Sequence, residues 1–274
     1  MQTAVECLGN PRCVYDYIDE LEVFPGERKV LEQNHPHLLN TATLVTATAE
    51  RLWRQVVASR SDALLCPNGV DYSFIRRTIE ETRQPPDDLA CVLRPAAPVI
   101  GYYGALAEWF DYELLRRAAA ERPEYEFVLI GPDYDRSLTK SRITNVKNIH
   151  WLGVRPYIQL PQYLKYFDVA TIPFKLNEIT HSTSPVKLFE YMAAGKPVVT
   201  TAMHESSRCE GVIVAEGPED FVRKLDEALK RKADPEYLSL IDGLARENTW
   251  DARVQQILEA LSMSDRRDRT QLQA

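Results

Sequence analysis

Residues 181–201 have the sequence HSTSPVKLFEYMAAGKPVVTT and decide the fold, because they join a well-bounded helix to a buried strand. Pro185 suits the first helical position, where a missing backbone N–H costs nothing, and Ser184 before it can serve as the N-cap. Gly195 can adopt the left-handed conformation that ends a helix, and the β-branched run of Pro197–Thr201 follows at once. A helix that leads directly into such a strand is typical of a parallel sheet covered by helices.

The same alternation extends outward over the chain from Pro98 onward. Amphipathic segments, with apolar residues at three-to-four-residue spacing, separate short β-branched runs. We predict six strands, at Val99–Tyr102, Glu126–Ile130, Asn148–Leu152, Asp168–Pro173, Pro197–Thr201 and Val212–Ala215. This succession predicts an α/β, doubly wound, Rossmann-like domain with a parallel sheet. Such domains bind ligands at the carboxyl ends of the strands, near the point where the strand order reverses.

The segment before Thr78 is also mixed, but it is too short for a complete second domain of this kind. We predict strands at Arg12–Ile18, Thr43–Thr48 and Ala63–Cys66, and helices from Glu27 and from Glu50. Composition then divides the chain into a partial N-terminal domain (1–77), a linker rich in proline and charge (78–97), the complete domain (98–248), a last helix (249–263) and a flexible tail (264–274).

Charge and composition narrow the classes of function. The net charge of −7 argues against a nucleic-acid surface, which needs clustered Lys and Arg to neutralise phosphates. Apolar runs are far shorter than the roughly 20 residues of a membrane span, and the N-terminus lacks a signal pattern, so we expect a cytoplasmic protein. Five cysteines without a C-x-x-C pair and five scattered histidines predict neither a disulfide scaffold nor a metal site.

The start of the helix at Pro185 is a candidate anion site. Its free backbone N–H groups would suit a diphosphate, aided by three consecutive hydroxyl side chains, those of Ser182, Thr183 and Ser184. Lys187 adds a positive charge one turn in, and Glu190 follows three residues later on the same face. Together they match the phosphates and ribose hydroxyls of a nucleoside diphosphate. The alternative is a capped surface helix with an ion pair worth about 0.2–0.5 kcal/mol.

A second segment, VIGYYGALAEWFD at 99–111, joins a strand to a helix through a turn that contains Gly101 and Gly104. Because glycine lets a backbone approach a phosphate or sugar closely, Gly104 and Ala105 are candidate ligand contacts. The segment lacks the complete G-x-G-x-x-G pattern of dinucleotide sites. A tight strand-to-helix turn explains its glycines equally well.

Three segments in order resemble a known family: GYYGALAEWFDYELLRRAAAERPEYEFVLIGP (101–132), NIHWLGVRPYIQLPQYLKYFDVATIPF (148–174) and SPVKLFEYMAAGKPVVTT (184–201). They are similar to the donor-binding domain of GT-B glycosyltransferases of the group 1 type, especially the branch related to teichuronic-acid and other cell-surface polysaccharide transferases. VYDYIDE (14–20) and LLCPNGVDYSF (64–74) resemble the late part of that family's acceptor domain. The resemblance implies a GT-B fold with a truncated acceptor-side half.

The resemblance also implies an activity. Family members transfer a sugar from a nucleotide diphosphate to an acceptor hydroxyl without a metal bound by a D-x-D motif, and this branch is expected to retain anomeric configuration. It implies no cofactor besides the nucleotide-sugar donor, and a glycan or lipid-linked acceptor. Lys187 and the amides of 182–184 would stabilise the leaving diphosphate, and Glu190 would accept hydrogen bonds from the ribose. The first glutamate of the family's E-x7-E pattern is Ser182 here.

A second departure concerns the cations that many relatives place after the first strand of the donor domain. Here the corresponding stretch, Ala105–Phe110, has none. Arg155, between Gly153 and Pro156, is the candidate for a second phosphate or base contact, with an exposed loop arginine as the alternative. On the acceptor side, Asp16 and Asp19 at a strand end are candidate acceptor ligands or a general base, although turn residues often have this composition.

Three functions therefore remain open. The first is an active glycosyltransferase for envelope or exopolysaccharide assembly. The second is a non-catalytic nucleotide-sugar-binding subunit or fragment, suggested by the short N-terminal region and the missing cations. The third is a nucleotide-sugar epimerase, which shares the architecture. Association with the inner face of the membrane and a partner chain that supplies the missing N-terminal half are further expectations.

Overall fold

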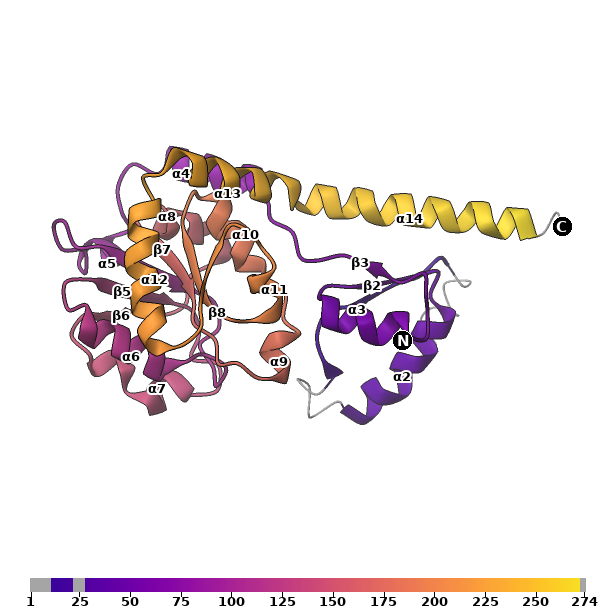
Figure 1. The fold of residues 1–274 in the computed structure, drawn as a ribbon, viewed down its shortest axis with the longest axis horizontal. Coiled ribbons are helices and arrows are strands. Elements are labelled where there is room, and N and C mark those ends of the chain that lie inside the picture. The colour runs from indigo at the N-terminus through magenta and orange to yellow at the C-terminus, as the bar shows by residue number, and fades with distance from the viewer. Residues whose placement is uncertain (1–10, 22–27, 272–274) are drawn as a thin grey trace. The chain divides into compact units, whose positions relative to one another are not determined.

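The computed structural model describes residues 11–21 and 28–271, which form two compact units (Figure 1). Of the described residues, unit 1 contains those up to Gly69, the short segment His181–Ser184 and those from Trp250 to Gln271. Unit 2 contains Val70–Thr180 and Pro185–Thr249. No helix in the described ranges has both the length and the apolar character that a membrane crossing requires.

Unit 2 is built on a parallel sheet of six strands, in the order β6-β5-β4-β7-β8-β9. The strands are β4 (Val99–Tyr103), β5 (Glu126–Ile130), β6 (Ile149–Trp151), β7 (Val169–Ile172), β8 (Val198–Thr201) and β9 (Val212–Ala215). The six predicted strands and the doubly wound α/β class are confirmed. The strand order reverses between β4 and β7, which places the expected ligand site at their carboxyl ends.

Helices cover this sheet in two groups. The helices of unit 2 are α4 (Tyr72–Glu81), α5 (Asp87–Ala90), α6 (Tyr112–Glu121), α7 (Ser137–Ser141), α8 (Leu160–Leu164), α10 (Val186–Ala193), α11 (His204–Ser207), α12 (Pro218–Arg231) and α13 (Pro235–Glu247), and α9 (Glu178–His181) ends at the boundary with unit 1. α12 packs against α6, and α10 packs against α4 and α13.

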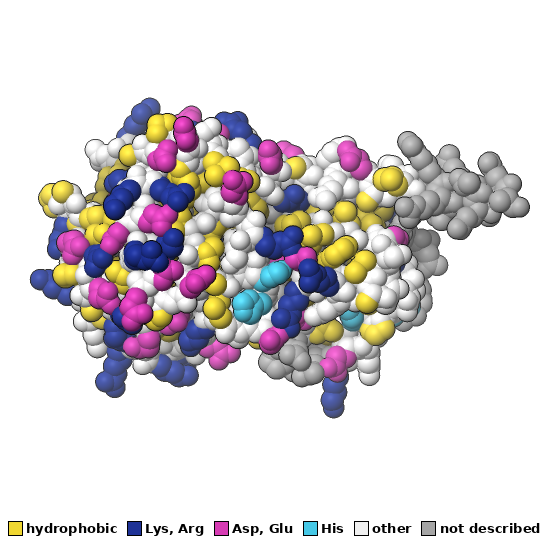
Figure 2. Space-filling model, in the orientation of Figure 1, with side chains coloured by type: hydrophobic (Ala, Val, Ile, Leu, Met, Phe, Trp, Pro, Cys, Tyr) yellow, Lys and Arg dark blue, Asp and Glu magenta, His cyan; other side chains and the backbone are white. Residues whose placement is uncertain are grey.

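Lys and Arg side chains of unit 2 lie among Asp and Glu side chains on the face shown in Figure 2.

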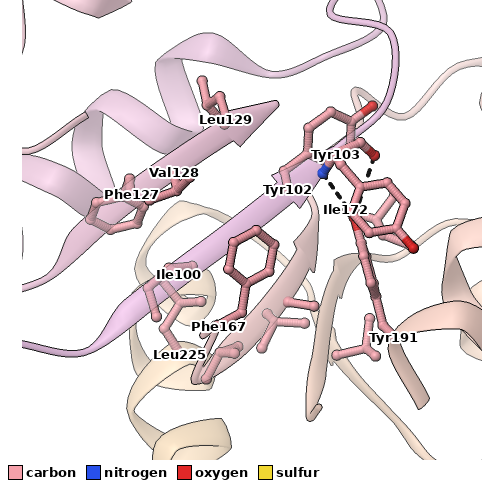
Figure 3. Close-up of a cluster of buried hydrophobic side chains, with 14 of the residues drawn as sticks. Ile100, Tyr102, Tyr103, Phe127, Val128, Leu129, Phe167, Ile172, Tyr191 and Leu225 are labelled. Atoms are coloured by element: carbon pink, nitrogen blue, oxygen red, sulfur yellow. Dashed lines mark hydrogen bonds between the residues drawn. The ribbon is translucent and has the colours of Figure 1, made fainter. Parts of the chain in front are cut away.

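The core of unit 2 surrounds the central strand β4 (Figure 3). Ile100, Phe127 and Phe167 are almost completely buried there. A Cβ on Gly101 would lie 2.0 Å from Cδ2 of Phe167. Gly101 is therefore required by the packing of a ring on the strand, and the expected approach of a ligand does not explain it.

The C-terminal end of helix α10 agrees with the sequence prediction, and its N-terminal end does not. The prediction that Ser184 is its N-cap is wrong, because Pro185 is extended (φ −75°, ψ 111°), occupies the cap position and delays the first helical residue to Val186. Gly195 is left-handed (φ 69°) as predicted. The amides of Gly195 and Lys196 donate to the carbonyls of Met192 and Tyr191, which satisfies the last turn of the helix.

Unit 1 contains a three-stranded parallel sheet in the order β1-β2-β3. Its elements are β1 (Val14–Tyr17), β2 (Leu44–Ala47), β3 (Leu64–Leu65), α2 (Arg28–Thr41), α3 (Glu50–Val57) and α14 (Trp250–Gln271). Val45, Leu52 and Val56 form a small core that is almost completely buried. The three predicted strands and the helix from Glu50 are confirmed, whereas Glu27 lies outside the described residues.

The two units divide the chain differently from the expected domains. The stretch expected as a linker (78–97) belongs to unit 2, where it completes α4 and forms α5. Leu89 of α5 is fully buried in the core of unit 2, so the apolar residues of this proline-rich stretch override its linker composition. The expected last helix (249–263) continues through part of the expected tail (264–274), because α14 extends to Gln271.

Candidate functional site

The site expected from the sheet topology lies where β4 and β7 separate. These strands pair only through Ile100 with Val169 and Gly101 with Ala170, so the backbone of Tyr103 lacks a ladder partner on this side. The hydroxyl of Tyr191, from α10, takes that place and accepts a hydrogen bond from the amide of Tyr103 at 3.0 Å (Figure 3). Helix α10 is thereby fastened to the carboxyl end of the central strand.

Lys187 lies in the first turn of α10 and is the central cation of the site. Its Nζ is 5.7 Å from the ring centroid of Tyr102 and 5.4 Å from that of Phe174, at the ends of β4 and β7. Burial lowers the pKa of Lys187, and the negative charge of Glu190 offsets part of that effect. Within the described ranges, Nζ has no carboxylate within 4.0 Å. Ring faces attract the ammonium but do not neutralise it, so an anionic ligand would stabilise it further.

Gly104 makes room for this lysine. Its φ of 139° lies in a region that other residues rarely adopt, and a Cβ there would lie 2.9 Å from both Cε of Lys187 and the hydroxyl of Tyr102. That hydroxyl donates to the carbonyl of Ala105 at 2.9 Å. The structure thus explains Gly104 through Lys187, and the proposed ligand contacts of Gly104 and Ala105 stay predictions.

Glu190 is 3% exposed and carries two hydrogen bonds from tyrosines. The hydroxyl of Tyr103 donates to Oε2 and that of Tyr157 to Oε1, both at 2.7 Å. Each carboxylate oxygen thus already accepts one hydrogen bond from the protein. Lys187 and Glu190 therefore form one cluster, as the i,i+3 spacing predicts, but the carboxylate is more buried than that of a surface ion pair.

The segment before α10 has partners within unit 1. Ser182 is buried, and its Oγ donates to Oε1 of Glu20 at 2.7 Å. The carbonyl of Ser184 accepts a hydrogen bond from the side chain of Asn68 at 2.7 Å. Thr183 belongs to the same segment. The hydroxyl of Ser182 is thus engaged by a carboxylate of the protein, and the predicted roles of Ser182, Thr183 and Ser184 at a diphosphate stay predictions.

Arg155 is engaged by the protein itself. Its guanidinium pairs with the carboxylate of Asp88, donates to the hydroxyl of Tyr163 at 2.8 Å and donates to the carbonyl of Val154 at 2.7 Å. Burial raises the pKa of Asp88, but the hydrogen bonds from Arg155 and Tyr163 outweigh it and leave that pKa low. These contacts join the loop after β6 to α5 and α8, and they favour a structural role for Arg155 over the predicted phosphate or base contact.

Asp16 and Asp19 lie at and just after β1 in unit 1. Asp16 is exposed and accepts a hydrogen bond from Oγ1 of Thr46 on β2 at 2.6 Å. Asp19 is partly buried, and this burial raises the pKa of its carboxyl group. A carboxylate with a raised pKa is the better of the two candidates for a general base.

Sequence reasoning missed the aromatic residues of the site. Tyr102, Tyr103, Phe174 and Tyr157 surround Lys187 and Glu190, and each lies at or after the end of a strand. Their position at the carboxyl ends of β4, β6 and β7 was the available signal. Which ring contacts which charge depends on contacts between residues 13 to 87 positions apart, which local patterns do not contain.

Comparison with known proteins indicates the class of protein to which the chain is similar. Residues 97–231 match the family "Glycosyl transferases group 1". The two-unit α/β architecture is that of GT-B glycosyltransferases, as the resemblance implied.

Individual relatives agree with this class. The Bacillus subtilis (strain 168) protein TuaH, which is named as a teichuronic acid biosynthesis glycosyltransferase, is 26% identical over 242 residues, which make up 85% of this chain. The chain spans only 60% of the length of TuaH.

Solved structures share the fold at lower identity. Anabaena HepE in complex with UDP superposes with a TM-score of 0.68 at 19% identity, over 96% of this chain and 75% of HepE. The α,α-trehalose 6-phosphate synthase of Burkholderia multivorans superposes with a TM-score of 0.69 at 12% identity, over 97% of this chain and 70% of the synthase.

Proposed function

We propose that this chain binds a nucleotide-diphosphate sugar at the carboxyl ends of β4 and β7 and serves the transfer of its sugar to an acceptor hydroxyl, with release of the nucleoside diphosphate. One observation carries the proposal. Lys187, a partly buried ammonium held between two aromatic rings, lies one helical turn from the buried carboxylate of Glu190. A cation beside an acceptor is the complement of a diphosphate attached to a ribose.

Lys187 would stabilise the negative charge that develops on the diphosphate as the sugar departs. Because the lysine is already held in place, this stabilisation requires little rearrangement during the reaction. Glu190 would accept a hydrogen bond from a ribose hydroxyl and orient the donor. A protein cation at the leaving group makes a bound metal or organic cofactor unnecessary, and the family resemblance favours retention of anomeric configuration.

Complexes of a relative with this fold support the choice of ligand. The HepE structures include one with UDP and one with UDP-glucose. The name of TuaH places that relative in teichuronic acid biosynthesis, which supports a glycan or lipid-linked acceptor in cell-surface polysaccharide assembly. Asp19, with Asp16 nearby in sequence, would bind the acceptor hydroxyl or accept its proton.

A non-catalytic nucleotide-sugar-binding protein is the second candidate. It is favoured by the loop after β4, because Ala105–Phe110 contains no cation and its Leu106 and Phe110 are fully buried. Charge-assisted contacts to a leaving diphosphate are strong, so their loss at this loop would slow transfer more than it would weaken binding.

Calorimetry combined with product analysis separates these candidates. The purified chain is titrated with UDP, GDP and ADP, and is then incubated with the matching nucleotide sugars with and without glycan acceptors. Binding together with transfer or slow donor hydrolysis is the expected result. Binding without any turnover would select the second candidate, and an epimerised donor would select an epimerase. Failure to bind any of the three nucleotides would contradict the proposal.

A further inference from the structure

The two tyrosines that donate to Glu190 differ in burial. Both hydroxyls lie 2.7 Å from a carboxylate oxygen, Tyr103 on Oε2 and Tyr157 on Oε1. Tyr103 is 4% exposed, whereas Tyr157 is 50% exposed. One oxygen of the carboxylate is therefore held by a residue of the core, and the other is held by a residue at the surface.

Tyr103 is fixed by the central sheet. It is part of β4, and its backbone amide donates to the hydroxyl of Tyr191. The two rings meet edge to face, with centroids 4.9 Å apart and an interplanar angle of 77°. Moving Tyr103 away from Glu190 would disrupt the core around β4, so this hydrogen bond persists whatever the site contains.

Tyr157 has few restraints in comparison. It begins the 3-10 turn Tyr157–Gln159, after Pro156, in the loop that follows β6. One ring face stacks on Phe74 of α4, with centroids 5.8 Å apart and an interplanar angle of 28°. Burial and the charge of Glu190 raise the pKa of Tyr157, so its hydroxyl remains a proton donor at neutral pH. An O–H group donating to this carboxylate oxygen has the same chemistry as a ribose hydroxyl.

We propose that Tyr157 occupies the place of a ribose hydroxyl on Glu190 in the empty site and gives up this hydrogen bond when a nucleoside diphosphate binds. Tyr157 is then a positioning residue. It keeps a buried carboxylate satisfied and oriented while the site is empty. The inference rests on the proposed function, because it requires that Glu190 meets a ribose. It has a measurable consequence: ribose binding exchanges one hydrogen bond for another, so Tyr157 lowers nucleotide affinity.

The test compares UDP with 2′,3′-dideoxy-UDP, which lacks the ribose hydroxyls, by calorimetry at neutral pH. If UDP is not the nucleotide that binds most tightly, the corresponding GDP or ADP pair is used. Tyr157→Phe removes the competing hydroxyl and keeps the ring on Phe74. We expect it to bind the ribonucleotide roughly 3–10-fold more tightly than the wild type, with no change for the dideoxy nucleotide. Tyr103→Phe, the matched control, removes the persistent hydrogen bond and should weaken ribonucleotide binding.

Other outcomes would overturn the inference. Unchanged or weaker ribonucleotide binding by Tyr157→Phe would show that the tyrosine does not compete. An equal gain for both nucleotides would show that space, not the hydroxyl, is exchanged. Tyr157→Leu, which retains an apolar contact for Phe74, must change the affinities in the same direction as Tyr157→Phe. Wild-type protein that binds no nucleoside diphosphate would instead refute the proposed function, and the inference with it.

Discussion

The two ends of helix α10 differ in the partners that the protein provides for a lysine. At the C-terminal end, Gly195 closes the last turn, and the ammonium of Lys196 donates to the carbonyl of Lys165 at 2.7 Å. At the N-terminal end, Lys187 faces two rings and, in the part of the chain that the structure describes, has no carboxylate in contact. The protein satisfies one lysine with its own atoms, and our proposal assigns the other to a ligand. Comparing the two ends therefore tests whether Lys187 has a functional role that Lys196 lacks.

Replacing Lys187 and replacing Lys196 should have very different effects on UDP affinity, and this is the largest difference that we expect between the two ends. Lys187→Met is expected to weaken UDP binding by roughly 10–100-fold, because a charge-assisted contact to phosphate is lost. Lys196→Met should leave UDP affinity within about twofold of the wild type. Isothermal titration of both variants measures the difference. Equal losses in the two variants would show that neither end is specific for the anion.

Gly104 and Gly195, which lie near the two ends of α10, should differ in what a substitution by alanine does to UDP binding. Gly104→Ala must fit a Cβ 2.9 Å from Cε of Lys187 at a φ of 139°, so we expect it to lose about 1–3 kcal/mol of stability and to displace the lysine from the site. Gly195→Ala meets no atom within 4 Å and carries only the strain of a left-handed residue, about 1 kcal/mol. Thermal unfolding and UDP titration should show a binding defect in Gly104→Ala alone. A comparable binding defect in Gly195→Ala would remove the distinction.

The pH dependence of binding sharpens the role of Lys187. Burial lowers the pKa of its ammonium in the empty site, and a bound diphosphate would raise that pKa again. UDP affinity should therefore stay level below the lowered pKa and fall as the pH rises through it. The same titrations on Lys187→Met should lack this fall. An identical decline in that variant would assign the titration to another group.

The smallest effect that we expect comes from the titration of Lys196, which should change the free energy of unfolding and leave UDP binding unaffected. Burial lowers its pKa from 10.5 to about 8, so the unfolded chain holds this proton more tightly than the folded chain. The free energy of unfolding should thus increase as the pH rises from about 8 towards 10.5. The gain is modest because the side chain is partly exposed. Chemical denaturation of the wild type and Lys196→Met across this range should show a larger increase in the wild type than in the variant.

Local sequence patterns were sufficient for the sheet and for part of the site. The β-branched runs predicted each strand of unit 2 to within one residue at either end, because buried parallel strands need such residues on both faces. The spacing of Lys187 and Glu190 predicted a shared face, because residues three apart are neighbours on a helix.

What could not be predicted depends on contacts distant in sequence. Arg155 pairs with Asp88, 67 positions away, and Glu190 is held by Tyr103, 87 positions away. The cap of α10 shifted from Ser184 to Pro185 because an extended proline starts the helix later. Burial of Leu89 turned an expected linker into part of unit 2. The pairings of Arg155 and Glu190 and the burial of Leu89 arise from tertiary packing that overrides local composition, whereas the shifted cap reflects the local backbone of Pro185.

A crystal structure of the chain with bound UDP tests the central claim most directly. We predict that the diphosphate lies within hydrogen-bonding distance of Nζ of Lys187 and that a ribose hydroxyl contacts the carboxylate of Glu190. A nucleotide bound elsewhere on the protein, with Lys187 still held only by the rings of Tyr102 and Phe174, would contradict the account.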